Sequence, residues 1–245
     1  MIYLVCLNWN TTDSLIRMYE SAKKLAKDKF NTIIVDNGST KEEYEKLLKY
    51  NFEDTKIVRS ENNLGFAAGN NLALENICSD CYIVFINSDI IISEQNWDEK
   101  YKETLDIDNV GVVGCAYHPL YWSRDGRFKI LPLSDSIVES ESVQGAFFGI
   151  KKVLLDVMKD NDGCYFDENF RFAHYEETDL CFRIMKFAKC MWMPLKHIHD
   201  HHHSSTKKNG FKLNSEIQNE QQFKANSERN RQLLLRKHAE WFASK

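Results

Sequence analysis

Three polar clusters that could bind a charged ligand each follow an apolar stretch of the sequence. They are Asn8-Trp9-Asn10, Asp36-Asn37 and Asn87-Ser88-Asp89. An apolar run rich in β-branched and aromatic residues, such as residues 82–86, predicts a strand that is buried on both faces. Because the carboxyl ends of parallel strands meet at one edge of a sheet, the three clusters should face one crevice. A polar turn would explain any one cluster, whereas their convergence favours a binding site.

Carboxylate and amide side chains in two of these clusters suggest specific contacts. Asp89 could hold a divalent cation, because oxygen ligands and water suit Mg²⁺ or Mn²⁺. A cation at this position would neutralise a diphosphate leaving group. Asp36 and Asn37 could hydrogen-bond a base or ribose, and the alternative is a type I turn that Gly38 completes.

A stretch rich in glycine and asparagine at residues 62–71 leads into a predicted helix. Asn63, Gly65, Gly69 and Asn70 lie in this stretch. Backbone N–H groups and the helix dipole at such a helix start could receive a pyrophosphate. The stretch contains neither the Gly-Lys-Ser/Thr of a Walker loop nor a GxGxxG motif, so its spacing alone is a weak signal.

Acidic and histidine side chains recur in the second half of the chain. Glu176, Glu177 and Asp179 offer a general base, or alternatively complement the dipole at a helix N-terminus. Helical spacing would place Glu176 and Asp179 one turn apart, with Glu177 pointing elsewhere. Five of the eight histidines lie at residues 197–203, where a His-x-His pair could bind a metal. Most of them are expected in a solvated loop, with one or two as ligands.

The pattern of apolar residues predicts elements that can bring these side chains together. Strands are expected at residues 2–7, 32–35, 56–59, 82–86, 110–114, 143–150 and 191–194. Helices are expected to begin near residues 13, 41, 66, 152 and 180, with a loop or small hairpin at 117–142 and a long polar helix at 215–244. The strand–helix alternation predicts an α/β fold with a mostly parallel central sheet flanked by helices.

Composition argues against several classes of protein. The chain has 245 residues and a net charge of -4, which gives no general drive toward nucleic acid or anionic membranes. No apolar run approaches the ~20 residues of a membrane span, and residues 1–7 lack the basic region of a signal peptide. The seven cysteines, with Cys78 and Cys81 as a lone CxxC pair, are expected to be reduced thiols. We therefore expect a cytoplasmic protein.

Taken together, the motifs resemble those of family 2 glycosyltransferases of the GT-A fold, especially the rhamnosyltransferase-like branch. The matching segments, in the family's order over roughly residues 2–205, are Asn8–Asn10, Val35–Ser39, Asn63–Asn70, Asn87–Asp89, Gly145–Phe148 and Glu176–Arg183. A C-terminal segment at Glu228–His238 is also similar. Each segment is short, but six in order make the resemblance specific.

The resemblance implies inverting transfer of a sugar from a UDP- or dTDP-linked donor, by direct displacement at the anomeric carbon. Asp89 would contact Mn²⁺ or Mg²⁺, with His199, or alternatively His201, as a further ligand. Glu177 stands where the family has the acid that deprotonates the acceptor, usually an aspartate, and Asp179 is the fallback. The residues expected at the nucleotide sugar are Asn8, Trp9, Asn10, Asp36, Asn37, Asn63, Gly65, Gly69, Asn70, Asn87, Ser88, Gln144, Gly145 and Glu176.

The resemblance also implies how the chain is divided and what it acts on. A GT-A domain at residues 1–210 would comprise a nucleotide-binding half (1–90) and an acceptor and catalytic half (110–210), followed by a helical extension (211–245). The expected acceptor is a saccharide or glycolipid hydroxyl, with a nucleic acid or protein acceptor as one alternative. A nucleotide-sugar-binding protein without transfer activity is another alternative. The basic C-terminal helix could contact a membrane peripherally, although a solvated face is the favoured interpretation.

Overall fold

Helices and strands alternate along the first half of the chain, in the predicted order. The computed structural model describes residues 1–77, 80–171, 174–200, 211–213, 216–218 and 220–245. The first half contains β1 (Ile2–Asn8), α1 (Thr12–Leu25), β2 (Asn31–Asn37), α2 (Lys41–Lys49), β3 (Thr55–Ser60), α3 (Gly65–Leu74), β4 (Tyr82–Ile86), β5 (Ile90–Ile92) and α4 (Trp97–Leu105). The second half contains β6 (Val110–Gly114), β7 (Leu120–Trp122), β8 (Phe128–Ile130), β9 (Val138–Glu139), β10 (Phe147–Lys151), α5 (Lys152–Asp162), α6 (Glu176–Ile184), β11 (Lys189–Trp192), β12 (His197–His199), β13 (Phe211–Leu213), β14 (Glu216–Gln218), α8 (Glu220–Lys237) and α9 (Ala239–Ala243).

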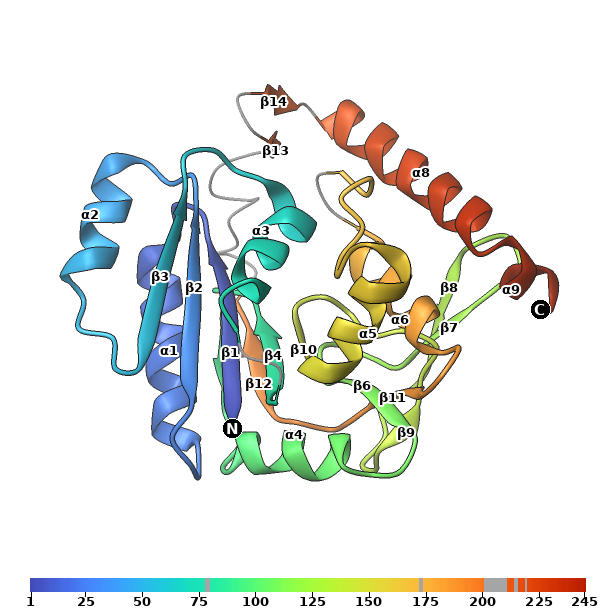
Figure 1. Ribbon diagram of the computed structural model, residues 1–245, viewed down its shortest axis with the longest axis horizontal. Coiled ribbons are helices and arrows are strands. Elements are labelled where there is room, and N and C mark those ends of the chain that lie inside the picture. Colours follow the sequence, from blue (N-terminus) through green and yellow to red (C-terminus); the bar gives the residue numbers. More distant parts are fainter. Residues whose placement is uncertain (78–79, 172–173, 201–210, 214–215, 219) are drawn as a thin grey trace.

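Eight strands form the central sheet, in the order β3-β2-β1-β4-β10-β6-β11-β9 (Figure 1). Strands β1 to β4 run parallel to one another, and β11 runs parallel to β6. Strand β10 is antiparallel to both of its neighbours, and β9 is antiparallel to β11 at the edge. The fold is therefore α/β with a mostly parallel sheet, as predicted. Because β1, β2 and β4 run side by side in one direction, their carboxyl ends share one edge.

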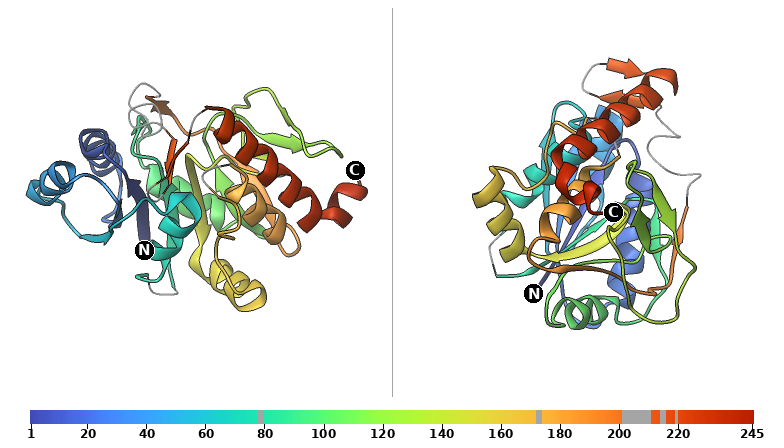
Figure 2. Two further views of the ribbon diagram at one scale, coloured as in Figure 1. Left: turned by 90° about the horizontal axis from the view of Figure 1, so that it is seen from above. Right: turned by 90° about the vertical axis from the view of Figure 1, so that its right-hand side faces the viewer.

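Helices cover both faces of this sheet and make three layers (Figures 1 and 2). Helices α1, α2 and α4 bury apolar side chains against one face, and α3, α5 and α6 do so against the other. Consecutive residues of β4 face opposite layers: Val84 and Ile86 pack with the first set, and Ile83 and Phe85 with the second. This burial on both sides explains why the central strands are continuous apolar runs.

The second half departs from the predicted elements in several places. The residues predicted as a strand at 143–150 form β10 only from Phe147 onward, and β11 ends at Trp192 rather than at residue 194. Helix α6 begins at Glu176 rather than near residue 180, so the acidic cluster forms its first turn. The small hairpin expected within 117–142 is β7–β8. Among the described residues, no helix is long and apolar enough to cross a bilayer.

Candidate functional site

A buried polar network joins the carboxyl ends of β1 and β2. Asn8 Nδ2 donates to Thr12 Oγ1 at 3.2 Å and, more weakly, to Asp36 Oδ1 at 3.5 Å. Arg59 Nη1 lies 3.3 Å from Asp36 Oδ2, which accepts no hydrogen bond from the described residues. Burial raises the pKa of Asp36, and this is partly opposed by hydrogen bonds from Ser39 and by the charge of Arg59. One buried carboxylate oxygen therefore has spare acceptor capacity at this sheet edge.

Asn37 ties the end of β2 to the start of α3. Its Nδ2 donates to Asn63 Oδ1 at 3.0 Å and to the Gly65 carbonyl at 3.1 Å. Its Oδ1 accepts from the Leu64 N–H at 2.9 Å. The polar atoms of Asn37 are thus engaged within the protein. This geometry fits a role in shaping the loop at 62–65 rather than a direct contact with a ligand.

Two glycines allow close packing around the same loop. Gly38 has a φ of +80°, and a Cβ there would lie 2.4 Å from the backbone carbonyl carbon of Asn62. A Cβ on Gly69 would lie 3.0 Å from Leu7 Cδ1, so this glycine faces the sheet. Asn70 is buried, and its Nδ2 donates to a carbonyl one turn earlier in α3. Gly69 therefore lets α3 pack closely against the sheet, and Asn70 bonds within α3, two structural roles that the prediction of a phosphate loop did not include.

Asp89 lies close to a histidine from a distant part of the sequence. Strand β12 pairs antiparallel with β5, and this register sets His199 opposite Ile90. His199 Nε2 consequently lies 3.3 Å from Asp89 Oδ1, with side chains that are 12% and 4% exposed. The other predicted ligand, His201, lies outside the described residues. Among the residues that are described, no group of three or more His, Cys, Asp or Glu side chains could hold a metal ion, so Asp89 and His199 stand as a pair.

The other residues at the ends of β1 and β4 are largely buried or bonded to neighbouring loops. Trp9 is 9% exposed. Asn10 has a φ of 55°, and its backbone N–H donates to Ser39 Oγ at 2.9 Å. Ser88 Oγ lies 3.0 Å from Thr11 Oγ1. These contacts connect the carboxyl ends of β1, β2 and β4, so the predicted convergence of the three clusters is confirmed.

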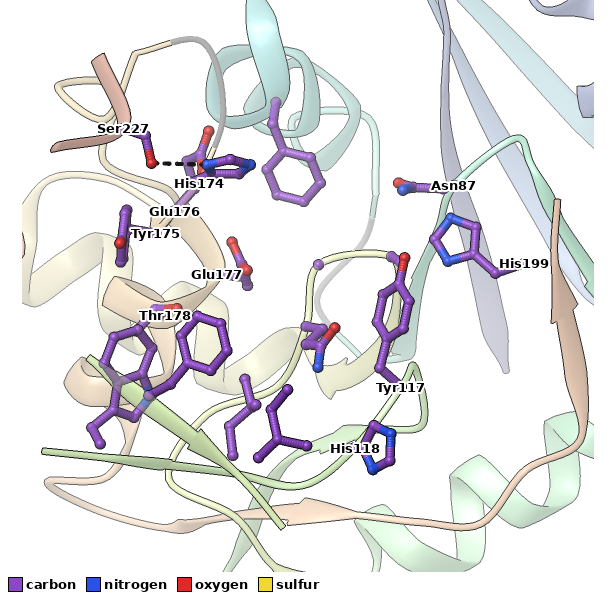
Figure 3. A pocket seen from close by; sticks show the side chains of 18 residues that line it. Asn87, Tyr117, His118, His174, Tyr175, Glu176, Glu177, Thr178, His199 and Ser227 are labelled. Carbon is purple, nitrogen blue, oxygen red and sulfur yellow. Dashed lines mark hydrogen bonds between the residues drawn. The ribbon is translucent and has the colours of Figure 1, made fainter. Parts of the chain in front are cut away.

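A pocket of about 650 Å³ opens beside this edge (Figure 3). Its walls come from both halves of the chain and from α8. They are Phe66, Asn87, Tyr117, His118, Leu120, Trp122, Phe128, Ile130, Gln144, Gly145, Ala146, His174, Tyr175, Glu176, Glu177, Thr178, His199 and Ser227. Glu177 projects into the space from one side, while Asn87, His199 and Tyr117 stand on the other (Figure 3). The pocket thus brings predicted catalytic, metal and sugar-binding residues together.

A left-handed turn directly precedes the two glutamates and places them at the pocket. His174 and Tyr175 both have a φ of 81°, and α6 begins immediately afterwards at Glu176. Residues other than glycine rarely adopt this conformation, and it persists where surrounding contacts hold it. Tyr117, which also lines the pocket, has a φ of 54°. Such backbone strain gathers at functional sites.

The adjacent glutamates have different electrostatic surroundings. Glu176 is 1% exposed, and burial, followed by repulsion from Glu177, raises its pKa well above the usual range. Burial raises the pKa of Glu177 to about 7, although hydrogen bonds from its own backbone and from Gly145 oppose the shift. Burial therefore favours the neutral acid form of Glu176, whereas Glu177, with a pKa of about 7, can exchange a proton near neutral pH. The second property is what a general base requires.

Asp179 lies outside the pocket lining and is not placed to act as the fallback base. Its Oδ1 lies 2.8 Å from His238 Nε2 and 2.9 Å from Lys237 Nζ, and its Oδ2 accepts from Arg183 Nε at 2.9 Å. Burial pushes the pKa of Asp179 upward, but His238, Arg183 and Lys237 together outweigh it and lower that pKa. Glu176 and Asp179 lie one turn apart in α6, as their spacing predicted, but Asp179 links α6 to the C-terminal helices instead of lining the pocket.

Much of the pocket wall was not predicted residue by residue. Trp122 and Phe128 come from the β7–β8 hairpin, for which the mixture of aromatic and charged residues at 117–142 gave a general signal. Ser227 comes from α8, and its Oγ lies 3.0 Å from His174 Nδ1. No local pattern could indicate this contact, because its partners lie far apart in sequence.

Comparison with known sequences gives a family match over most of the chain. A family model described as "Glycosyl transferase family 2" matches residues 4–166. A curated relative, glycosyltransferase GlyG of Streptococcus pneumoniae serotype 4, is 27% identical over 130 residues. That alignment covers 52% of this chain and 42% of GlyG, so it spans less than half of the relative's length.

Several solved structures share the fold. A structure of GalNAc-T7 with UDP, GalNAc and Mn²⁺ has a TM-score of 0.64 at 16% identity, covering 79% of this chain and 42% of that one. S. aureus TarS 1-349 has a TM-score of 0.58 at 17% identity, covering 80% and 58%. The mannosyltransferase PcManGT of Pyrobaculum calidifontis, with GDP-Man and Mn²⁺, has a TM-score of 0.57 at 13% identity, covering 79% and 54%. At these identities the similarity establishes a shared GT-A fold.

Proposed function

The chain belongs to glycosyl transferase family 2, and we propose that it transfers a sugar from a UDP- or dTDP-linked donor to a saccharide or glycolipid hydroxyl. The observation that carries the proposal is the convergence of Asp36, Asp89 and His199 near a pocket that contains Glu177. The transfer is an inverting displacement at the anomeric carbon. In this proposal residues 1–90 bind the nucleotide, 110–210 bind the acceptor, and 211–245 form a helical extension.

The strand edge around Asp36 offers a site for the base of the donor. Asp36 Oδ2 is buried beside Arg59 and accepts no hydrogen bond from the described residues. Uracil and thymine each carry a ring N–H that could donate to such an oxygen. Leaving a buried acceptor unsatisfied costs free energy, so a donor from the ligand would stabilise the complex. This spare acceptor supports a UDP- or dTDP-linked sugar.

Asp89 and His199 are suited to hold a divalent cation. They provide an oxygen and a nitrogen donor 3.3 Å apart, both mostly buried. Mn²⁺ accepts both donor types, whereas Mg²⁺ strongly prefers oxygen, so the pair favours Mn²⁺. GalNAc-T7 and PcManGT are both described with Mn²⁺. When bound, the cation would neutralise the diphosphate as it leaves.

Glu177 supplies the base in this proposal. Its carboxylate accepts the proton of the acceptor hydroxyl while the hydroxyl oxygen bonds to the anomeric carbon. The bond from that carbon to the diphosphate oxygen breaks at the same time, and the electron pair leaves with the diphosphate. Burial and the charge of Glu177 favour the protonated form of Glu176, which limits the negative charge in the pocket. The carboxyl groups in the pocket favour transfer over binding without catalysis.

A calorimetric titration with UDP and dTDP tests the donor and metal sites. In the presence of Mn²⁺ one of the two nucleotides should bind, and Asp89→Asn should weaken that binding about tenfold or more, because one lost charged contact costs over 1.4 kcal/mol. Asp160→Asn removes the same charge from an exposed position on α5 and should leave binding unchanged. Equal affinities in all three proteins, or no binding of either nucleotide, would overturn the proposed donor site.

A further inference from the structure

Helix α8 turns one face toward the segment that precedes α6. Phe223, Ser227, Asn230 and Leu234 recur at helical spacing on this face, and His238 follows just beyond the helix. The ring of Phe223 lies 5.1 Å from that of His174, and Ser227 Oγ lies 3.0 Å from His174 Nδ1. The dashed line in Figure 3 marks the second contact. The C-terminal helix therefore contacts the turn that delivers Glu176 and Glu177.

Asn230 makes the most buried of these polar contacts. Its side chain has an exposed fraction of zero, and its Nδ2 donates to the Arg171 carbonyl at 2.9 Å and to the His174 carbonyl at 3.3 Å. Its Oδ1 accepts from Arg229 Nη1 at 3.2 Å. One amide group therefore ties together carbonyls on either side of residues 172–173. The second of these carbonyls belongs to a residue in the left-handed turn.

Helix α8 is attached to the rest of the protein by several contacts besides those of Asn230. Lys237 and His238 bind the buried carboxylate of Asp179 in α6. Leu234 packs in an apolar cluster with Trp122, Phe170, Phe182 and Phe242. Because these contacts lie one to two turns further along the chain, they can hold α8 in place when the Asn230 amide is removed. Of the two carbonyl contacts of Asn230, the one to His174 reaches the turn itself.

We propose that Asn230 is a positioning residue, which holds the His174–Tyr175 turn in its left-handed conformation and so sets Glu177 against the acceptor hydroxyl. This inference rests on the proposed role of Glu177 as the base. Left-handed backbone at two consecutive residues is unfavourable and needs contacts that hold it. Without the amide, the turn relaxes, and Glu177 moves away from its productive position. A displacement of about 1 Å at a catalytic group can lower a rate about 100-fold.

The test compares Asn230→Ala and Asn230→Asp with Gln232→Ala, which removes an amide from an exposed position of α8. Turnover would be followed with the nucleotide sugar that the wild type consumes fastest among UDP-glucose, UDP-N-acetylglucosamine and dTDP-rhamnose. Both Asn230 variants should lose about 10- to 100-fold in kcat, while the KM for the donor and the binding of UDP with Mn²⁺ change less than about twofold. Asp has the shape of Asn but cannot donate these hydrogen bonds, so its loss should match that of Ala.

A second readout separates positioning from a general structural role. In the Asn230 variants, the apparent pKa of the kcat/KM profile should fall from about 7 toward the ordinary glutamate value of about 4.3, as water reaches Glu177. Wild-type kcat in both Asn230 variants would overturn the inference. So would loss of cooperative unfolding or of UDP binding in proportion to kcat. If Glu177→Gln keeps wild-type turnover, the proposed base itself is wrong, which is a different failure.

Discussion

At the scale of single residues, the pocket gives two neighbouring glutamates different surroundings. Burial raises the pKa of Glu176 well above its usual range, while it raises the pKa of Glu177 to about 7. The resemblance of the sequence to a family placed the base at Glu177, with Asp179 as an alternative. Residue types alone could not choose between them, because the choice depends on burial, on the left-handed turn at His174 and Tyr175, and on the cations around Asp179.

The ionisation of Glu177 should be visible in both rate and stability. The kcat/KM for donor turnover should rise with pH through about 7, because the base must lose its proton before it can accept one. The measurement is a pH–rate profile between pH 5 and 9 in buffers of constant ionic strength. A profile that is flat across this range would contradict the assignment.

The same ionisation should lower the stability of the folded protein as pH rises, whereas it raises the rate. A raised carboxyl pKa means that the native state binds the proton more tightly than the unfolded chain, so this group lowers stability as pH rises from about 4.5 to about 7. The Glu177→Gln variant lacks this pH-dependent loss. Above pH 7 its free energy of unfolding should therefore be greater than that of the wild type by on the order of 2 kcal/mol. Near pH 5 the free energies of unfolding of the two proteins should be more similar. Urea unfolding at pH 5 and 8 measures the difference.

At the scale of elements, α6 is held by the C-terminal helices through one buried carboxylate. Asp179 is fully buried and is surrounded by Arg183, Lys237 and His238. Asp179→Asn should cost about 3 kcal/mol at pH 7, because the buried Arg183 guanidinium loses the nearer of its two carboxylate partners and keeps only Asp162. Since the pKa of Asp179 is lowered, its contribution is present above the ordinary aspartate pKa of about 3.9 and is lost in acid.

The control for this variant is an exposed ion pair. Glu45→Gln breaks the pair with Lys41 on α2, where both side chains are largely exposed, and it should leave stability nearly unchanged. Urea unfolding of the three proteins checks the prediction. If Asp179→Asn and Glu45→Gln have equal effects, the carboxylate does not carry the link between α6 and the C-terminal helices.

The elements differ in how well the sequence predicts them, for physical reasons. Strand β4 has the predicted bounds because its five apolar residues are buried on both faces and end at a polar cluster. Strands β5 and β12 were not predicted, since each has three residues and, within the described part of the chain, pairs with the other alone. This pairing is what places His199 beside Asp89. Local patterns cannot indicate a register between segments so far apart.

At the scale of the whole molecule, the two sides of the site come from different parts of the chain. The family match ends at residue 166, and the sheet edge formed by the ends of β1, β2 and β4, which we propose binds the donor, lies within it. Helix α6, β12 and α8, which supply Glu177, His199 and Ser227 to the pocket, lie beyond it. Motifs in the first part therefore predicted this sheet edge. The opposite wall of the pocket depends on long-range packing, such as that between α8 and the turn before α6.

Turnover of a nucleotide sugar by matched glutamate variants tests the proposed transfer most directly. With Mn²⁺ and the donor selected from a panel of UDP- and dTDP-sugars, Glu177→Gln should lose about 100-fold or more in kcat, within the range for removal of a general base. Glu176→Gln replaces a carboxyl group whose pKa is raised well above the usual range with a neutral amide of similar shape, and it should keep most of the activity. Both variants should bind UDP as the wild type does. Wild-type turnover by Glu177→Gln, or equal losses in the two variants, would contradict the proposed mechanism.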